Sequence, residues 1–461
     1  MKKRHYITIL FLLLFVGAGA QCWRQICPAS YNVGFHVVGI QTDGTLWAWG
    51  YNSVGQLGDG TTTNRVVPTQ VGTATDWAYA ASGTNSSYAI KQDGSLWAWG
   101  GNNFGQLADG TTTSRSIPAQ VLPGTTWSKV EAGEYFVVAQ KTDGSLWSCG
   151  YNTFDQLGVP GASDTYNFIL VSTDTDWLEY KCNFRHTVLI KNNGTFWGWG
   201  EGNFGKLATG DDNGNDHPFS PLTDTDWAQV IPGGNSTLFR KTNGTIWGVG
   251  QNNVGELGFG TNLNYNYTLQ QIGTSNDWSS IEGGTFHTMV IKNDGTLWSC
   301  GWNINGQLGN GTTTNTNTLA QVGTATNWAK VRCSKQFTIA LDNNGTLWAW
   351  GDNTVGELGD GTTISRLVPT PIGSTCTMAT PGYSQSFMSL LNNPVKDRVQ
   401  LSFNRDGIKT IAVYNSLGAL LQSNTYSSDF VNLDVSNYAT GVYFVTCSLD
   451  GAKQTVKVVK Q

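Results

Sequence analysis

The sequence predicts an all-β protein, a seven-bladed β-propeller followed by a small C-terminal β-sandwich. Three observations support this fold class. The chain has 57 glycines and 19 tryptophans but only 13% charged residues, a balance typical of short strands joined by tight turns. A turn dipeptide recurs seven times at intervals of 50 or 51 residues. The period stops after Gly373 and short alternating strands follow from residue 391, so the 461 residues form a repeat array with an accessory module.

The recurring dipeptide marks a hairpin in each repeat. Asp-Gly or Asn-Gly between two short apolar runs is a strong hairpin signal, because both central residues of a type I′ turn need positive φ. The glycine of the first dipeptide is Gly44, and the glycines of the other six dipeptides follow it at intervals of 50 or 51 residues. The seven copies are Asp43-Gly44, Asp93-Gly94, Asp143-Gly144, Asn193-Gly194, Asn243-Gly244, Asp294-Gly295 and Asn344-Gly345.

Each repeat contains further strands on both sides of the hairpin. A tryptophan opens a strand 17 residues before the glycine in six copies, as Trp77 does. The motif Gly-x-Asn-x-x-Gly-Gln-Leu-Gly follows the hairpin at 50–58, then a polar loop and a strand at 68–71. Three or four strands in about fifty residues make one propeller blade. Trp23 opens the strand of the first copy and the last copy ends at Gly373, so we expect the ring to close between them.

The hairpin with Leu-Trp-x-Trp-Gly, followed by Asn-x-x-Gly-Gln-Leu-Gly, resembles the repeat of the regulator-of-chromosome-condensation family. The resemblance extends over about residues 22–373 and implies a seven-bladed propeller. Two local departures are Gly202, in place of the motif asparagine, and Asp155, in place of a glycine.

The N-terminus predicts export. Residues 1–20 combine a basic start, an apolar run and a small-residue exit, which is the pattern of a signal peptide cleaved after Ala20. The run is too short for a membrane span, and Gln21 before Cys22 disfavours lipidation. Loss of Lys2, Lys3 and Arg4 takes the net charge from −5 to −8 (−5 − 3), so we expect no nucleic-acid partner. The predicted propeller domain is then 21–376.

The last eighty residues form a second domain. We expect a linker at 377–390 and a β-sandwich at 391–461. The segments 393–397, 413–418, 433–436, 441–445 and 457–460 resemble the type A sorting domain of the type IX secretion system, although 391–394 departs from its usual Tyr-Pro-Asn-Pro opening. The resemblance implies that the secretion machinery of a Bacteroidetes-type bacterium delivers the protein to the cell surface or the medium, commonly removing this domain. An ordinary sandwich without a sorting role is the alternative.

Eight cysteines in an exported chain favour disulfides. Cys149 and Cys182 are 33 residues apart, as are Cys300 and Cys333, and both pairs occupy the same two repeat positions. We therefore expect two identical bridges between neighbouring blades. A third bridge from Cys376 would close the ring, with either Cys22 or Cys27 as its partner. Zinc binding is the rival interpretation, but no Cys-x-x-Cys supports it.

No catalytic constellation is evident. The phosphate-binding loop, the His-Glu-x-x-His motif and the Gly-x-Ser-x-Gly elbow are all missing. His36, His186 and His287 share one repeat position with serine and phenylalanine, which favours packing over catalysis. Eighteen of the 19 tryptophans fall in three repeat columns, which indicates blade packing, and only Trp302 lies outside them. We expect no enzyme activity, no cofactor and no metal.

One departure from the repeat suggests a binding patch. Copies three, four and five replace the Gly-Thr-Thr-Thr loop with other sequences, and consecutive copies place these loops side by side. Aromatic residues of this kind anchor interfaces when exposed, although neutral drift in loops explains the change equally well. The candidate partner-binding residues are Tyr166, Phe168, His217, Phe219, Tyr265 and Tyr267.

These features favour an exported binding module for an extracellular protein or glycan. A structural or adhesive surface protein is the first alternative. A glycan-degrading propeller enzyme is a weaker one, because it would need carboxylates gathered in a cleft.

Overall fold

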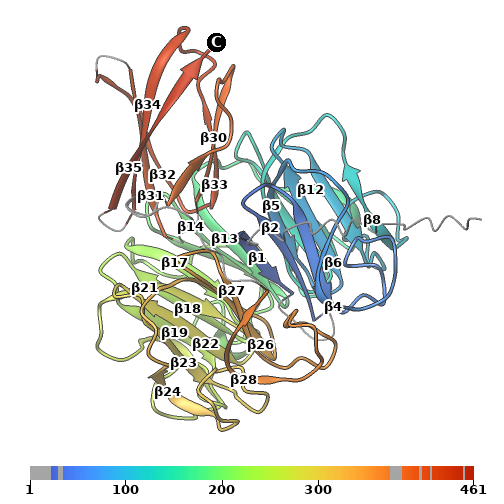
Figure 1. Cartoon of the computed structure of the whole chain (residues 1–461). Helices are drawn as coiled ribbons and strands as arrows, with labels where there is room; N and C mark the ends of the chain where they lie inside the picture. Colours follow the sequence, from blue (N-terminus) through green and yellow to red (C-terminus); the bar gives the residue numbers. More distant parts are fainter. Residues whose placement is uncertain (1–21, 30–34, 374–386, 404–406, 416–417, 450–451) are drawn as a thin grey trace, which may run out of the picture.

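The computed structural model shows a ring of seven blades with a second β domain stacked on one end (Figure 1). It describes residues 22–29, 35–373, 387–403, 407–415, 418–449 and 452–461. The predicted signal peptide lies outside these ranges. Among the described residues, no helix is long and apolar enough to cross a membrane.

Each blade is a four-stranded antiparallel sheet formed by one contiguous repeat. Blade 1 consists of β1 Trp23–Pro28, β2 His36–Gln41, β3 Leu46–Gly50 and β4 Arg65–Gln70, and blade 2 of β5 Trp77–Ser82, β6 Ser86–Lys91, β7 Leu96–Gly100 and β8 Arg115–Val121. Blade 3 consists of β9 Trp127–Ala132, β10 Phe136–Lys141, β11 Leu146–Gly150 and β12 Thr165–Ser172, and blade 4 of β13 Trp177–Asn183, β14 His186–Lys191, β15 Phe196–Gly200 and β16 Asn215–Phe219. A short 3-10 helix, η1 Asn203–Gly205, precedes β16.

Blades 5 to 7 repeat the arrangement. Their strands are β17 Trp227–Pro232, β18 Ser236–Lys241, β19 Ile246–Gln251 and β20 Tyr265–Gln271; β21 Trp278–Gly283, β22 His287–Lys292, β23 Leu297–Gly301 and β24 Thr316–Gln321; β25 Trp328–Cys333, β26 Phe337–Asp342, β27 Leu347–Gly351 and β28 Arg366–Ile372. In every blade the tryptophan-opened strand is the first of the sheet, and it lines the channel.

The repeat places two kinds of connection at opposite ends of the ring. The Asp-Gly turns join the second and third strands; Gly44 has φ 82° there, and Asp43 Oδ1 accepts the Thr45 N–H at 3.0 Å. We call this end the hairpin face. The connections between first and second strands, and between third and fourth, lie at the other end, which we call the loop face. The Gly-x-Asn motif is part of the loop face.

Tryptophans hold neighbouring blades together, as their columns predict. Trp99 is fully buried in blade 2, and its indole Nε1 donates to the Gln56 carbonyl of blade 1 at 2.9 Å. Trp77 packs edge-on against Trp97 with ring centroids 5.9 Å apart, and the Lys91 ammonium lies about 5 Å from both rings. The packing interpretation of these columns is confirmed, because the strand-opening tryptophans are 0 to 7% exposed.

The ring closes by the same contacts that join its other blades. Trp49 Nε1 donates to the Glu357 carbonyl of blade 7 at 3.0 Å, as Trp99 does to Gln56 one blade further on. The Trp23 amide donates to the Gly345 carbonyl at 3.1 Å. No strand is exchanged between the first and last blades of the described ring, so β1 belongs wholly to blade 1.

The C-terminal domain is a two-sheet sandwich. One sheet has the order β29-β30-β33 and the other β32-β31-β34-β35, around an apolar core that includes Val413, Val445 and Phe403. Its strands are β29 Met388–Leu390, β30 Arg398–Phe403, β31 Lys409–Asn415, β32 Leu420–Tyr426, β33 Phe430–Asp434, β34 Gly441–Leu449 and β35 Ala452–Lys460. Strand β29 lies within the predicted linker, so the sandwich begins slightly earlier than expected.

Candidate functional site

The predicted rim patch lies at the outer edge of blades 3 to 5, but its six residues do not form one surface. Tyr166, Phe219 and Tyr265 are exposed, and so is His217. Phe168 is buried, with its ring centroid 4.7 Å from that of Trp127. Its inclusion in the patch was wrong because β12 turns this side chain inward, into the core between blades 2 and 3.

Two members of the rim patch also hold blades together. Tyr166 packs on Gly105 of the preceding blade, where an added Cβ would lie 2.2 Å from the tyrosine ring. Tyr267 packs in the same way on Gly205, and its hydroxyl donates to Asp212 Oδ2 at 3.0 Å. This position of the outer strand contacts the preceding blade throughout the ring, so a packing role accounts for part of the aromatic signal.

A second aromatic group lies on the loop face of blades 2 to 4 and was not predicted. We call it the aromatic strip, and it consists of Phe104, Tyr135, Tyr151, Phe154, Phe184 and Arg185. The Phe104 centroid is 5.0 Å from Tyr135 and 4.7 Å from Tyr151. The strip continues to Phe154, over which the Arg185 guanidinium lies at 4.1 Å. Five of these side chains are half-buried, and Phe184 is buried.

Charged groups beneath the strip fix its position. Arg185 Nε donates to Glu134 Oε2 at 2.7 Å, and its Nη1 lies 3.6 Å from Glu201 Oε1. The Lys206 ammonium, with no exposed surface, is 2.5 Å from Glu201 Oε2. Burial lowers the pKa of Lys206 and raises that of Glu134, in each case against the attraction of its ionic partners. Tyr135 has φ 60°, an uncommon conformation for a bulky residue and one found often at functional sites.

The strip is detectable in the sequence once the repeat positions are known. The residue two places after the motif asparagine, or after Gly202 in the fourth copy, is phenylalanine at 104, 154 and 204, valine at 54, 254 and 355, and asparagine at 305. These residues lie inside the conventional motif or beside it, so they do not depart from the repeat as the loops of copies three to five do.

The three histidines have structural contacts. Each imidazole Nε2 lies within hydrogen-bond distance of a hydroxyl on the next blade, at 2.9 Å from Ser87 for His36 and 3.0 Å from Thr338 for His287. Burial lowers the pKa of His287 to about 3, so this ring is neutral at physiological pH. The predicted packing role is confirmed by these contacts.

The two predicted inter-blade disulfides do not form, because all four cysteines are free. Cys149 lies in the core between blades 2 and 3, with Sγ 3.1 Å from the Gly105 carbonyl, whereas Cys182 lies between blades 3 and 4. The members of the pair are therefore on opposite faces of blade 3. Cys300 and Cys333 are separated in the same way.

The predicted third bridge is only partly visible. Cys27 is free and Cys22 is disulfide-bonded. Cys376, which we expected to pair with either Cys22 or Cys27, lies outside the described residues.

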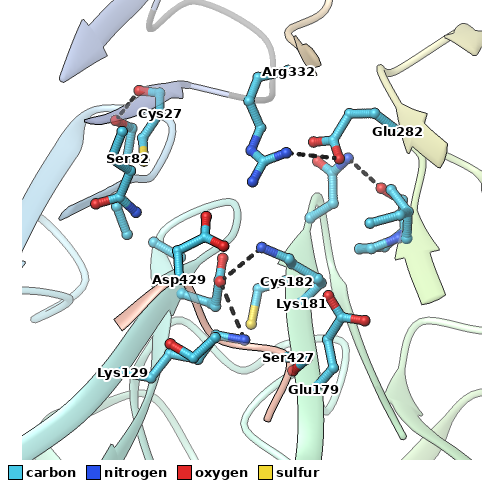
Figure 2. Close-up of a pocket in the computed structure, with 18 of the residues that line it drawn as sticks. Cys27, Ser82, Lys129, Glu179, Lys181, Cys182, Glu282, Arg332, Ser427 and Asp429 are labelled. Carbon is cyan, nitrogen blue, oxygen red and sulfur yellow. Dashed lines mark hydrogen bonds and ion pairs between the residues drawn. The ribbon is translucent and has the colours of Figure 1, made fainter. Parts of the chain in front are cut away.

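The seven inner strands enclose a charged channel, a cavity of about 110 Å³ (Figure 2). Glu131 has three polar contacts in it: the ammonium of Lys181 lies at 3.0 Å, that of Lys129 lies at 3.6 Å, and the Tyr79 hydroxyl donates at 2.7 Å. Arg332 lies 3.5 Å from Glu282. The C-terminal domain adds Asp429, which points into the space between these groups. Among the described residues, no three His, Cys, Asp or Glu side chains are grouped to hold a metal ion.

The ring and its appended sandwich define the class of protein, a repeat-built β-propeller with a C-terminal accessory domain. Repeats described as "Regulator of chromosome condensation (RCC1) repeat" match residues 43–90, 93–140, 294–341 and 344–387, and a second model of that repeat matches 278–307 and 328–357. A "Secretion system C-terminal sorting domain" matches residues 392–461. The chain thus contains regulator-of-chromosome-condensation repeats and a secretion sorting domain, and the sorting domain implies export to the cell surface or the medium.

Similar proteins agree on the fold. The crystal structure of human WBSCR16 has a TM-score of 0.65 at 19% identity, covering 72% of this chain and 95% of that one. Prp20p from Saccharomyces cerevisiae also has a TM-score of 0.65, at 18% identity, covering 73% and 88%. An X-linked retinitis pigmentosa GTPase regulator homolog from Caenorhabditis elegans is 48% identical over 44 residues, which is 9% of this chain and only 3% of that protein.

Proposed function

We propose that this protein is an exported, non-enzymatic binding module that captures an extracellular protein or glycan through the loop face of blades 2 to 4. The aromatic strip is the observation that carries the proposal. Tyrosine, phenylalanine and arginine are residues on which binding energy concentrates, and the strip presents them as one connected group.

The strip has the rigidity that a binding surface needs. Arg185 is held by Glu134 and stacked on Phe154, so it loses little conformational freedom when a partner arrives. Aromatic side chains have few rotatable bonds and lose correspondingly little entropy on binding. The sorting domain docks on the hairpin face, which leaves the loop face accessible in the full chain.

The proposal is tested by capture of surface and culture proteins and of an arrayed glycan panel. Three purified variants of the exported chain are compared with wild type. The strip variant replaces Phe104, Tyr151 and Phe154 by alanine, and the rim variant replaces Tyr166, His217, Phe219 and Tyr265. The control is Ile364→Ala, an exposed apolar residue on the outer loop of blade 7.

We expect the strip variant to bind at least about tenfold more weakly than wild type, because loss of even one central aromatic anchor removes more than about 1 kcal/mol. The control should bind normally, and all variants should keep the near-ultraviolet circular dichroism of the folded ring. Loss of binding in the rim variant alone would relocate the site to the edge. Equal binding by wild type and both variants would refute a loop-face site.

A further inference from the structure

The propeller's channel has an excess of positive charge at the hairpin face. Its inner strands contribute three carboxylates and five cations, and one of these cations, Lys330 of blade 7, contacts the sorting domain. The carboxylates are Glu131, Glu179 and Glu282, and the cations are Arg24, Lys129, Lys181, Lys330 and Arg332. Burying a charge is costly unless a group of opposite sign lies beside it, so an anion is favoured at this mouth.

The sorting domain supplies that anion from a loop. The connection between β32 and β33 carries Asp429 into the mouth, where its Oδ2 lies 2.7 Å from the Lys330 ammonium. Lys330 is 2% exposed at its side chain and also donates to the Phe403 carbonyl at 3.3 Å. On the sorting-domain side, Lys409 holds the other carboxylate oxygen at 3.1 Å and donates to the Ser427 carbonyl at 3.3 Å. The loop therefore presents one carboxylate in a fixed position.

The electrostatics match this geometry. Burial on its own would raise the pKa of Asp429, but Lys330, Lys409 and Arg332 outweigh it and lower the pKa well below its ordinary value. The carboxylate is therefore charged, and its charge is stabilised from the propeller as well as from its own domain.

The rest of the contact is small and centred on the same loop. Phe430 joins the apolar core of blades 2 and 3, and the Ser427 hydroxyl donates to the Leu178 carbonyl. Gln400 donates to the Gln92 carbonyl at the edge. Between these points a cavity of about 640 Å³ separates the sandwich from blades 3 and 4. The described contacts between the two domains therefore lie around this loop and beside that cavity.

We propose that the hairpin-face mouth of the channel is a binding site for a carboxylate carried on a protein loop, and that Asp429 fills this site in the full chain. The sorting domain then acts as an internal ligand that blocks the mouth while it is docked. When the mouth is open, the site takes an aspartate or glutamate side chain presented by the loop of another protein.

The first experiment starts from the full chain with a site-specific protease sequence in place of residues 377–386. After cleavage, the two halves are separated and the sorting domain is titrated back onto the ring. We expect Asp429→Asn to weaken rebinding about 10- to 100-fold, because it leaves Lys330 buried opposite a neutral amide. The matched control is Asp397→Asn, an exposed aspartate of the same domain, which should rebind like wild type.

A double-mutant cycle with Lys330→Gln tests the pair directly. We expect the two substitutions together to weaken rebinding little more than either alone. If the Asp429→Asn sorting domain rebinds as tightly as wild type, the proposal is overturned. This result does not depend on the Lys330→Gln ring, because Asp429→Asn changes only the sorting domain.

The second experiment tests the ligand class with a disulfide-closed peptide that carries residues 425–431. We expect the separated ring to bind it, and to bind the Asp429→Asn version at least about tenfold more weakly. The uncut chain should bind neither, because its own loop occupies the mouth. Equal binding of both peptides, no binding to the ring, or equal binding to ring and uncut chain would each overturn the proposed carboxylate site.

Discussion

Replacing Glu201 by glutamine is expected to lower the free energy of unfolding of the propeller by about 3–5 kcal/mol, the usual cost of leaving a buried charge without its ionic partner. Lys206 has no exposed surface, and Glu201 lies 2.5 Å from its ammonium. The remaining polar contact, to Asn235 Oδ1 at 3.4 Å, is neutral. Urea unfolding followed by tryptophan fluorescence measures the effect.

The neighbouring blades provide the matched control. Blades 1 and 3 carry Tyr51 with Gln56 and Tyr151 with Gln156 at the same two positions. The double variant Glu201→Tyr with Lys206→Gln removes the ion pair as a unit, and replacing a whole buried pair is often neutral or stabilising. We therefore expect its stability to lie within about 1 kcal/mol of wild type or above it. A double variant as unstable as Glu201→Gln would show that the charges themselves are required.

Replacing Glu256 or Glu357 by glutamine is expected to stabilise the propeller at pH 8 by on the order of 3 kcal/mol per site. Both glutamates occupy the glutamine position of the repeat motif, both are at most 2% exposed, and burial raises the pKa of each to about 7. Each uses one carboxylate oxygen as glutamine does elsewhere, accepting the N–H of Val254 or Val355. Glutamine keeps that hydrogen bond without a charge.

The pH dependence of the free energy of unfolding shows whether the buried glutamate charge causes this difference in stability. The ordinary pKa of these groups is 4.5, so between pH 4.5 and about 7 the unfolded chain loses protons that the folded chain retains. Stability then falls as the pH rises, by about 1.4 kcal/mol per pH unit per site, and levels off above pH 7. The advantage of the glutamine variants should therefore be large at pH 8 and vanish near pH 4. The reverse change, Gln307→Glu, should introduce the same loss, and a gain independent of pH would contradict this account.

The periodic parts of the fold were predictable from sequence because each repeat has the same kinds of residue at the same positions. The turn glycines, the strand-opening tryptophans and the Leu-Trp column satisfy constraints that act within one blade or between adjacent blades, and seven copies reinforce them. Even the first blade was placed correctly from Trp23, despite its longer first connection.

Features that depend on which side of a strand a residue occupies were harder to predict. Cys149 and Cys182 were paired by spacing, yet Cys149 faces blade 2 and Cys182 lies between blades 3 and 4, so the two thiols are in different inter-blade cores. Phe168 failed as a surface candidate for the same reason. The contact between Asp429 and Lys330 joins residues 99 positions apart in two domains, and no repeat or motif connects them. Such contacts are visible only in three dimensions.

The closure of the ring has a consequence for how the chain can be rearranged. Since blade 7 meets blade 1 through the same tryptophan-to-carbonyl bond that joins blades 1 and 2, no blade is required to be first. A circular permutant that opens between two other blades, with a short peptide joining residues 373 and 22, retains every inter-blade bond. The termini can then be placed between any two blades, so the sorting domain can be attached to the last strand of any blade of the ring.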